Sequence, residues 1–283
     1  MNGKNRLERL GYYSDLATER RRAQPHTSGV EFEKVRCAVG VWERVRITDE
    51  EGARALRRPV GSYETLHTDR LDLVDGDIAT EISEEISKKL LSFCKRLSVV
   101  PNRILAVGLG NPRLTPDSVG PIAAGDILPT MHLQAIDGEY FDALSCSEIA
   151  VSIPNVTAES GIDTLRAVRA LCREISPRLV ILIDSILTSS PERLGSSVQI
   201  CDTGIAPGSG IGNHSKAINR ESLGVPVFSI GVPTVIDARA LCEDGCPKNG
   251  NLLVAPREID SIVKAAGRIV GEAVNRAFGI IGL

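Results

Sequence analysis

Apolar and polar residues follow different patterns in successive parts of this chain of 283 residues. Residues 1–30 are polar, charged and poorly periodic, which indicates a mobile or detachable arm. Residues 35–47 are rich in β-branched residues with rough alternation and predict a strand. Residues 77–97 repeat apolar positions at helical spacing and predict an amphipathic helix. Its apolar stripe consists of Ile78, Ile82, Ile86, Leu90, Phe93 and Leu97.

Short apolar runs alternate with helical patterns from residue 103 onward. Three of these runs predict buried strands, at 103–110, 178–185 and 225–233. Alternation of strands with helices predicts an α/β domain of three layers around a largely parallel or mixed sheet. The first hundred residues are then expected to form an accessory, β-containing N-terminal layer.

Two helices are predicted in this second part of the chain. The segment 161–176 is expected to begin after Ser160 as its N-cap, with Asp163 at the capping-box position and Pro177 beyond its end. A long helix within 255–278 is expected to end the fold. Its apolar side consists of Ile259, Ile262, Val263, Ala266, Ile269, Val270 and Val274.

Composition excludes several classes of partner. The net charge is −3 and aromatic residues make up only 4% of the chain, which disfavours nucleic-acid binding. The charged cluster at 19–22 is expected to be a solvated part of the arm. No apolar run is long enough to span a bilayer, and the N-terminus has no signal-peptide core. Seven scattered cysteines predict a reduced, cytoplasmic protein, and Cys242 and Cys246 are either thiols without a ligand or half of a zinc site.

The loop that follows the first buried strand, "GLGNPRLTPD" (108–117), has two possible chemistries. A dinucleotide-binding loop needs a third glycine and an immediate helix, but Arg113 stands at the third position, and Pro112 and Pro116 prevent that helix. No Walker motif occurs in the chain. A nucleotide is therefore disfavoured, and the alternative is that the loop presents Asp117 for chemistry.

Carboxylates remain the best candidates for catalysis. The chain has no Gly-x-Ser-x-Gly elbow and no His-Glu-x-x-His helix, and His132 and His214 are expected to be structural or solvent-facing. Asp184 ends the most apolar predicted strand, where an acid is costly unless it is paired, hydrogen-bonded or protonated. It is either a structural aspartate or the partner of Asp117 in a pair that shares a proton. The glycine-rich segment 202–213 is either a surface turn or a loop that grips substrate through its amides.

Several long motifs occur in the same order as in the germination protease family, which the chain resembles from its N-terminal arm to its last helix. They are "VGLGNPRLTPDSVGP", "LVILIDSI", "VQICDTGIAPGSGIGN", "LGVPVFSIGVPTVIDA" and "NLLVAPREID". The resemblance implies an atypical aspartic endopeptidase that begins the degradation of small acid-soluble spore proteins during germination, in the cytoplasm of the spore core. It also implies a fold similar to the hydrogenase-maturation proteases and a homotetramer.

Motif by motif, the resemblance places the two catalytic aspartates on Asp117 and Asp184. Gly108, Gly110 and Asn111 are expected to shape the loop that carries the first of them, or to bind substrate. No metal and no cofactor are expected, and the only partners expected are the substrate proteins and further copies of the chain.

The resemblance further implies a zymogen that processes itself. Cleavage sites in the family resemble an acid followed by a large apolar residue and alanine, and Asp15, Leu16 and Ala17 fit this pattern. Residues 1–15 are thus expected to be a propeptide, and 16–283 a single peptidase domain with an accessory layer (16–100) and a catalytic core (101–283).

The sequence departs from the family pattern in two places. Only "RALCEDGCPKNG" follows the "PTVIDA" motif at 233–238, where longer members carry a sizeable insertion, and the family's "RTDLA" is "YSDLA" here. Two other functions remain open at this point: a metal-dependent maturation-type peptidase that uses the same acids, and a non-catalytic nucleotide-binding module.

Overall fold

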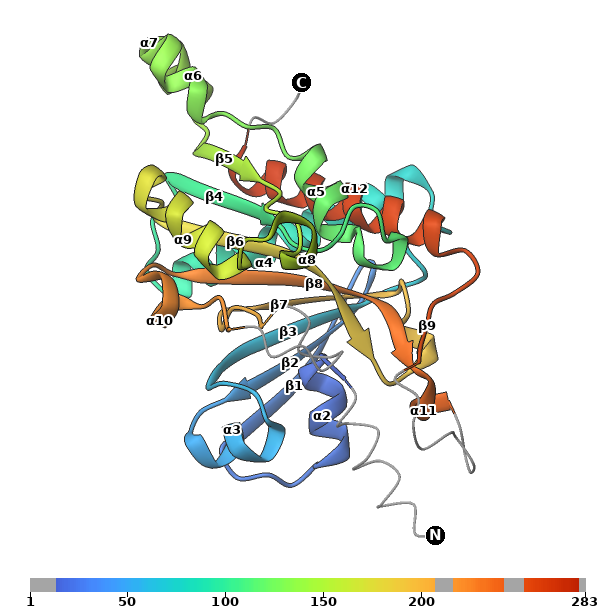
Figure 1. Cartoon of the computed structure of the whole chain (residues 1–283). Helices are drawn as coiled ribbons and strands as arrows, with labels where there is room; N and C mark the ends of the chain where they lie inside the picture. Colours follow the sequence, from blue (N-terminus) through green and yellow to red (C-terminus); the bar gives the residue numbers. More distant parts are fainter. Residues whose placement is uncertain (1–13, 207–215, 242–251, 280–283) are drawn as a thin grey trace, which may run out of the picture.

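The computed structural model of the chain describes residues 14–206, 216–241 and 252–279. Its described strands form one nine-stranded mixed sheet (Figure 1). They are β1 (Val30–Cys37), β2 (Gly40–Ile47), β3 (Gly61–His67), β4 (Arg103–Gly108), β5 (Glu148–Ser152), β6 (Leu179–Thr188), β7 (Ser197–Cys201), β8 (Val227–Asp237) and β9 (Leu253–Val254). Their order is β1-β2-β3-β7-β8-β6-β4-β5, with β9 beside β8.

Parallel and antiparallel pairing divide the sheet. The strands β5, β4, β6 and β8 are parallel to their neighbours in that order, whereas β7 and the three N-terminal strands continue the sheet by antiparallel pairing. The expectation of a three-layer α/β fold with a mixed sheet is therefore confirmed. The largely parallel sheet that strand–helix alternation favoured is limited to these four strands.

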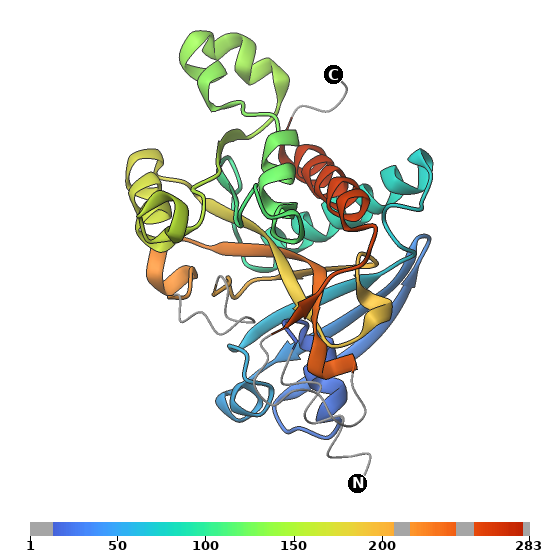
Figure 2. The ribbon, with the colours of Figure 1, turned by 45° about the vertical axis from the view of Figure 1, so that its right-hand side comes forward.

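Helices cover both faces of the parallel strands (Figure 2). On one face, α4 and α12 pack beside each other and α5 packs on α12, while α9 covers the opposite face. The described α-helices are α2 (Ala17–Ala23), α3 (Glu50–Leu56), α4 (Gly76–Arg96), α5 (Val119–Asp126), α6 (Met131–Ile136), α7 (Gly138–Leu144), α8 (Thr157–Ser160), α9 (Thr164–Ile175), α10 (Arg220–Leu223), α11 (Ala238–Leu241) and α12 (Ile259–Phe278). None of the helices in this part of the chain is long and apolar enough to cross a membrane.

The alternation of side chains along β4 shows how the two faces arise. Ile104 and Ala106 belong to the apolar cluster under α4 and α12, whereas Leu105 and Val107 belong to the cluster under α9. Successive side chains of a strand point to opposite faces, so a continuous apolar run is what a strand covered on both sides requires. The interpretation of 103–110 as a buried strand is confirmed.

The expected strand at 35–47 is wrong in its boundaries. Two antiparallel strands occupy this region, because β1 ends at Cys37, the chain turns, and β2 begins opposite it at Gly40. At Gly40 φ is +151°, and a Cβ there would lie 1.9 Å from the carbonyl oxygen of His67. The alternation of apolar and polar residues continues through this turn, so the pattern alone does not show where one strand ends and the next begins.

Three expectations about the helices need correction. The stripe of α4 is buried from Ile82 to Phe93, but Ile78 and Leu97 at its ends are exposed. Ser160 ends the short helix α8 and does not cap α9. The N-cap of α9 is Asp163, whose carboxylate accepts a hydrogen bond from the Arg166 N–H at 3.0 Å.

The N-terminal arm is also more ordered than expected. Residues 1–13 lie outside the described part, but Leu16 and Ala17 are fully buried and α2 packs against β2, α3 and β3. The accessory layer joins the same sheet through β3 and β7, and Trp42 of β2 belongs to the apolar cluster that contains α4 and α12. The predicted boundary at 100–101 thus falls inside one continuous sheet.

Candidate active site

Asp117 is held by a tightly folded loop after β4. The chain passes through Gly110 at φ +112° to a short 3-10 helix at Thr115–Asp117, and the Asn111 N–H donates to Asp117 Oδ2 at 2.8 Å. A Cβ at Gly110 would lie 2.0 Å from the Asp117 carbonyl oxygen, so this close approach requires glycine. Gly108 plays a different part, because a Cβ there would lie 2.3 Å from the Gly120 carbonyl oxygen and push α5 away from β4.

Asp184 lies within β6, at the middle of the sheet. The strand continues to Thr188, four residues past the aspartate, so the expectation that Asp184 ends it is wrong. The neighbouring strand β4 does end there, since Gly108 is paired with Ile183 and the Leu109 N–H donates to the Ile183 carbonyl at 2.8 Å. The loop that carries Asp117 therefore leaves the sheet beside Asp184.

The two aspartates line one cavity of about 280 Å³. Burial raises the pKa of Asp117, although the hydrogen bond from Asn111 opposes this. Asp184 is only 6% exposed, and burial followed by the negative charge of Asp117 raises its pKa well above the usual range. The negative charge of either carboxylate therefore disfavours ionisation of the other.

Comparison with known proteins identifies the family that carries this site. The family model for germination protease, Peptidase A25, matches residues 13–248. The chain belongs to the germination protease family. A germination protease of Clostridium perfringens (strain 13 / Type A) is 32% identical over 93% of this chain and 94% of its own length. That of Caldanaerobacter subterraneus subsp. tengcongensis is 33% identical over 83% of each chain.

This germination protease family member is therefore a peptidase of spore germination, which replaces the nucleotide-binding alternative. Among solved structures, the [NiFe] hydrogenase maturation protease HycI from Thermococcus kodakarensis is similar over 62% of this chain and 93% of its own, with 17% identity. The TM-score of that similarity is only 0.34.

The side chain of a third acidic residue, Asp15, lines the same cavity. Its backbone N–H donates to the Leu187 carbonyl at 2.8 Å, and its side-chain Oδ2 accepts from the Leu187 N–H at 3.0 Å. Its Oδ1 accepts from Arg58 at 2.9 Å. The Gln199 amide holds the backbone on both sides of Leu16, donating to the Asp15 carbonyl at 3.2 Å and accepting from the Ala17 N–H at 2.8 Å.

Sequence reasoning missed Arg58 and Gln199 as cavity residues. Arg58 follows α3 in the N-terminal layer and lies outside the quoted motifs. Gln199 lies in β7 and is part of the "VQICDTGIAPGSGIGN" motif, but nothing in that motif assigned a role to its amide. Of the glycine-rich segment 202–213, the described residues Gly204, Ile205 and Ala206 line the cavity. The remainder lies outside the described residues.

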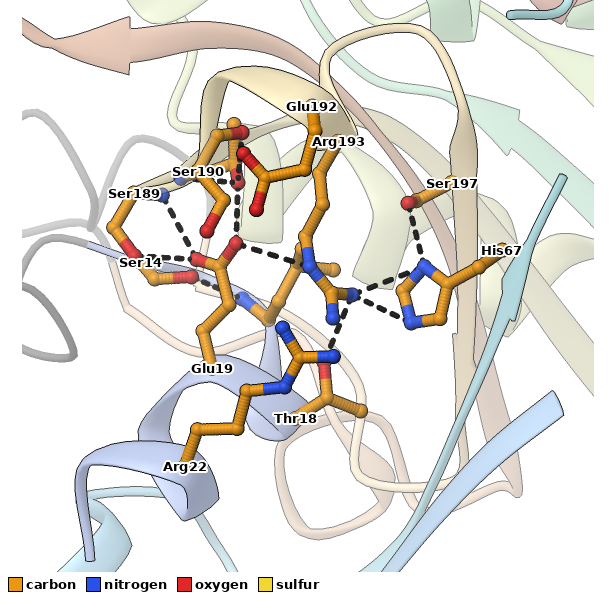
Figure 3. A network of polar contacts seen from close by, with 12 residues as sticks. Ser14, Thr18, Glu19, Arg22, His67, Ser189, Ser190, Glu192, Arg193 and Ser197 are labelled. Carbon is orange, nitrogen blue, oxygen red and sulfur yellow. Dashed lines mark hydrogen bonds and ion pairs between the residues drawn. The ribbon is translucent and has the colours of Figure 1, made fainter. Parts of the chain in front are cut away.

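The helix α2 is tied to the sheet by a buried polar network (Figure 3). The Glu19 carboxylate accepts from the Thr188 hydroxyl at 2.6 Å and from the Ser189 N–H and hydroxyl at 2.8 and 2.7 Å. It also forms an ion pair with Arg193 at 3.4 Å, and both side chains are almost fully buried. The charged cluster predicted to be solvated thus contains a buried acid, and residues just after Asp15 are fixed to the end of β6.

Arg193 connects this network to the N-terminal layer. It pairs with Glu43 at 3.2 Å. It also contacts His67, whose Nδ1 lies 2.8 Å from the Ser197 hydroxyl (Figure 3). Burial lowers the pKa of His67, so its ring is neutral at neutral pH and can accept from the guanidinium. This set of contacts fixes the 3-10 helix at Pro191–Arg193, which follows β6, against β2 and β3.

The remaining residues considered from sequence lie away from the aspartate pair or outside the described part. His132 is exposed on α6, as expected. His214, Cys242 and Cys246 lie outside the described residues. Within residues 14–206, 216–241 and 252–279, no three His, Cys, Asp or Glu side chains are grouped as metal ligands would be.

Proposed function

We propose that this chain is an endopeptidase that hydrolyses small acid-soluble spore proteins in the spore core, with Asp117 and Asp184 as its catalytic pair. The observation that carries this proposal is that both carboxyl groups line one cavity and that their pKa values are raised together. A pair that holds one proton supplies a general base and a general acid at the same time.

The two environments assign the two roles. Asp117 accepts the Asn111 N–H and is the less buried of the two, so it is the ionised base that takes a proton from water. Asp184 is buried beside that charge and keeps the shared proton. As the water oxygen bonds to the peptide carbonyl carbon, Asp184 donates its proton to the carbonyl oxygen. When the C–N bond breaks, the proton held by Asp117 passes to the leaving nitrogen. One hydroxyl of the tetrahedral intermediate then returns its proton to Asp184 as the new carboxyl group forms, which restores the starting protonation of the pair.

Purified enzyme incubated with an acid-soluble spore protein tests this function, with fragment masses measured by mass spectrometry. We expect a few discrete fragments from the wild-type chain and none from Asp117→Asn or Asp184→Asn. Asp137→Asn is a matched control, because Asp137 is an exposed N-cap of α7 and asparagine caps a helix equally well. Cleavage by either active-site variant at the wild-type rate would remove that residue from the mechanism.

We also propose that the chain is made as a precursor that cuts itself between Asp15 and Leu16. Asp15 lines the cavity that contains the catalytic pair, which supports cleavage at this bond. Glu19 and its partners hold the residues that follow, so the new N-terminus at Leu16 stays docked after residues 1–15 leave. Mild acid is the expected trigger, because the pair must first gain its shared proton.

N-terminal sequencing after an acid pulse tests the processing step. We expect the wild-type chain to begin at Leu16 and Asp117→Asn to remain uncut until active enzyme is added. An active enzyme that still begins at Met1, or that is cut at another bond, would contradict the proposal. Sedimentation analysis of the same samples tests the proposed homotetramer.

A further inference from the structure

The contacts of Asp15 are of two kinds: those made by its backbone, which any residue could form, and those made by its side-chain carboxylate. The Leu187 carbonyl and the Gln199 amide bind its backbone. Arg20 Nε donates to the Ser14 carbonyl just before it at 2.7 Å, and Arg58 donates to the same carbonyl at 3.4 Å. These contacts would form with any peptide. Among the described residues, the carboxylate itself accepts from the Leu187 N–H and from the Arg58 guanidinium.

Only one of these two partners distinguishes a carboxylate from a neutral amide. The Leu187 N–H can donate equally well to the side-chain oxygen of asparagine or glutamine. Arg58 carries a full positive charge, and its contact with Oδ1 is a charge-assisted hydrogen bond between side chains that are each 18% exposed. Such a half-buried pair is screened much less than a pair on the open surface.

We propose that Arg58 is a specificity residue of this peptidase, which selects an acidic residue on the N-terminal side of the bond that is cut. The inference rests on the proposed function. The chain's own Asp15 shows the geometry of recognition: Arg58 on the carboxylate, and Leu187 and Gln199 on the backbone, in the cavity that contains Asp117 and Asp184.

None of these three recognition residues belongs to the segment that processing removes. Arg58 follows α3, Leu187 lies in β6 and Gln199 lies in β7. When residues 1–15 leave, Arg58 loses the carboxylate that neutralises it, while its position beside the cavity is kept by the fold. An incoming peptide with aspartate or glutamate at this position restores the ion pair, whereas a peptide with a neutral or basic residue leaves a partly desolvated cation unpaired.

A pair of peptides separates this role from a structural one. Both copy residues 12–19. They differ only at the position of Asp15, just before the bond to Leu16 that is cut, where one has aspartate and the other asparagine. Full-length chains are processed by resin-bound wild-type enzyme, which is then removed, and kcat/KM is measured for each peptide. The wild-type enzyme is expected to prefer the aspartate peptide by about 10- to 100-fold, the range for a charge-assisted hydrogen bond.

Arg58→Gln is expected to reduce this preference to less than about threefold, because it loses much more activity on the aspartate peptide than on the asparagine peptide. The long contact with the preceding carbonyl is lost with both peptides alike. Arg58→Lys keeps the charge and is expected to keep part of the preference. Arg54→Gln, on the exposed side of α3, is the matched control and should behave as wild type. If Arg58→Gln is too unstable to purify, Arg58→Lys and the distribution of its cuts in a spore protein decide the question.

The possible outcomes distinguish this inference from the function on which it rests. A wild-type chain that cuts neither peptide nor any spore protein would refute the proposed function. A wild-type chain that cuts them without preferring an acid, or an Arg58→Gln enzyme that keeps the wild-type preference, would refute the role of Arg58 and leave the function standing. A structural role for Arg58 alone would reduce cleavage of both peptides by the same factor.

Discussion

Replacing Asp184 with asparagine should abolish activity and yet stabilise the fold at neutral pH. The substitution preserves shape, and the new side-chain oxygen can still accept from the Ser185 N–H, which donates to Asp184 Oδ1 at 2.9 Å. What it removes is the proton that the mechanism needs. Loss of one general acid–base group lowers the rate by about 10²- to 10⁴-fold, or roughly 3 to 5 kcal/mol in the barrier.

The effect on stability follows from the raised pKa of Asp184. In the unfolded chain an aspartate ionises near pH 3.9, whereas burial and the charge of Asp117 keep Asp184 protonated to higher pH in the folded protein. Between these two pKa values the folded state holds one proton more than the unfolded state. The free energy of unfolding of the wild-type chain therefore falls, through this group, by about 1.4 kcal/mol per pH unit across that window.

Urea denaturation of both chains at several pH values from 3.5 to 8 measures this difference. Asp184→Asn should match the wild type at the acid end, gain stability as the pH rises, and keep a constant advantage above the folded pKa. Mass spectrometry at each pH confirms that the chains are uncut. In an Asp117→Asn background the pH range over which the stabilities diverge should become narrower but persist, because burial raises the pKa of Asp184 more than the charge of Asp117 does. A difference that is constant with pH, or a variant less stable throughout, would refute the reasoning.

The other predictions concern the loop, the network under α2 and metal dependence. Gly110→Ala places a Cβ 2.0 Å from the Asp117 carbonyl at φ +112° and should lower both kcat and the melting temperature, at a cost of roughly 1–3 kcal/mol; Gly125→Ala, with open space around it, should do neither. Glu19→Ala strands the buried Ser189 donors and should lower the free energy of unfolding by roughly 3–5 kcal/mol, and Glu19→Gln by clearly less, as denaturant titration will show. Activity should persist after exhaustive dialysis against a chelator, and a loss that zinc or another divalent ion restores would favour the metal-dependent alternative.

Much of the core could be predicted because burial leaves a periodic signal. The strand segments 104–107 and 179–183 are apolar at every position, since both of their faces are covered, and α4 shows a helical stripe. Asp117 and Asp184 stood out because an acid beside such a run needs a partner or a proton. These inferences depend only on the chemistry of neighbouring residues in the sequence.

Pairing between distant polar residues leaves no such signal. Glu19 belongs to a run of charges that is typical of a solvated segment, and it is buried only because Thr188, Ser189 and Arg193 compensate it. Gln199 sits in a strand pattern, and nothing in its neighbourhood shows that its amide binds the backbone around Leu16. Contacts of this kind appear only once the sheet has brought the segments together.

The junction between β3 and β7 also means that the proposed active site is complete only when residues far apart in the chain have been brought together. The two strands pair although His67 and Ser197 are 130 residues apart, and closing so long a loop makes their association a late, slow event of folding. A nascent chain that has emerged only as far as residue 190 already carries both aspartates, but it has no Gln199 and no β7 to hold the N-terminal layer beside them. We therefore expect chains truncated before β7 to be inactive as proteases, because they lack the strand and the glutamine proposed to hold a substrate backbone.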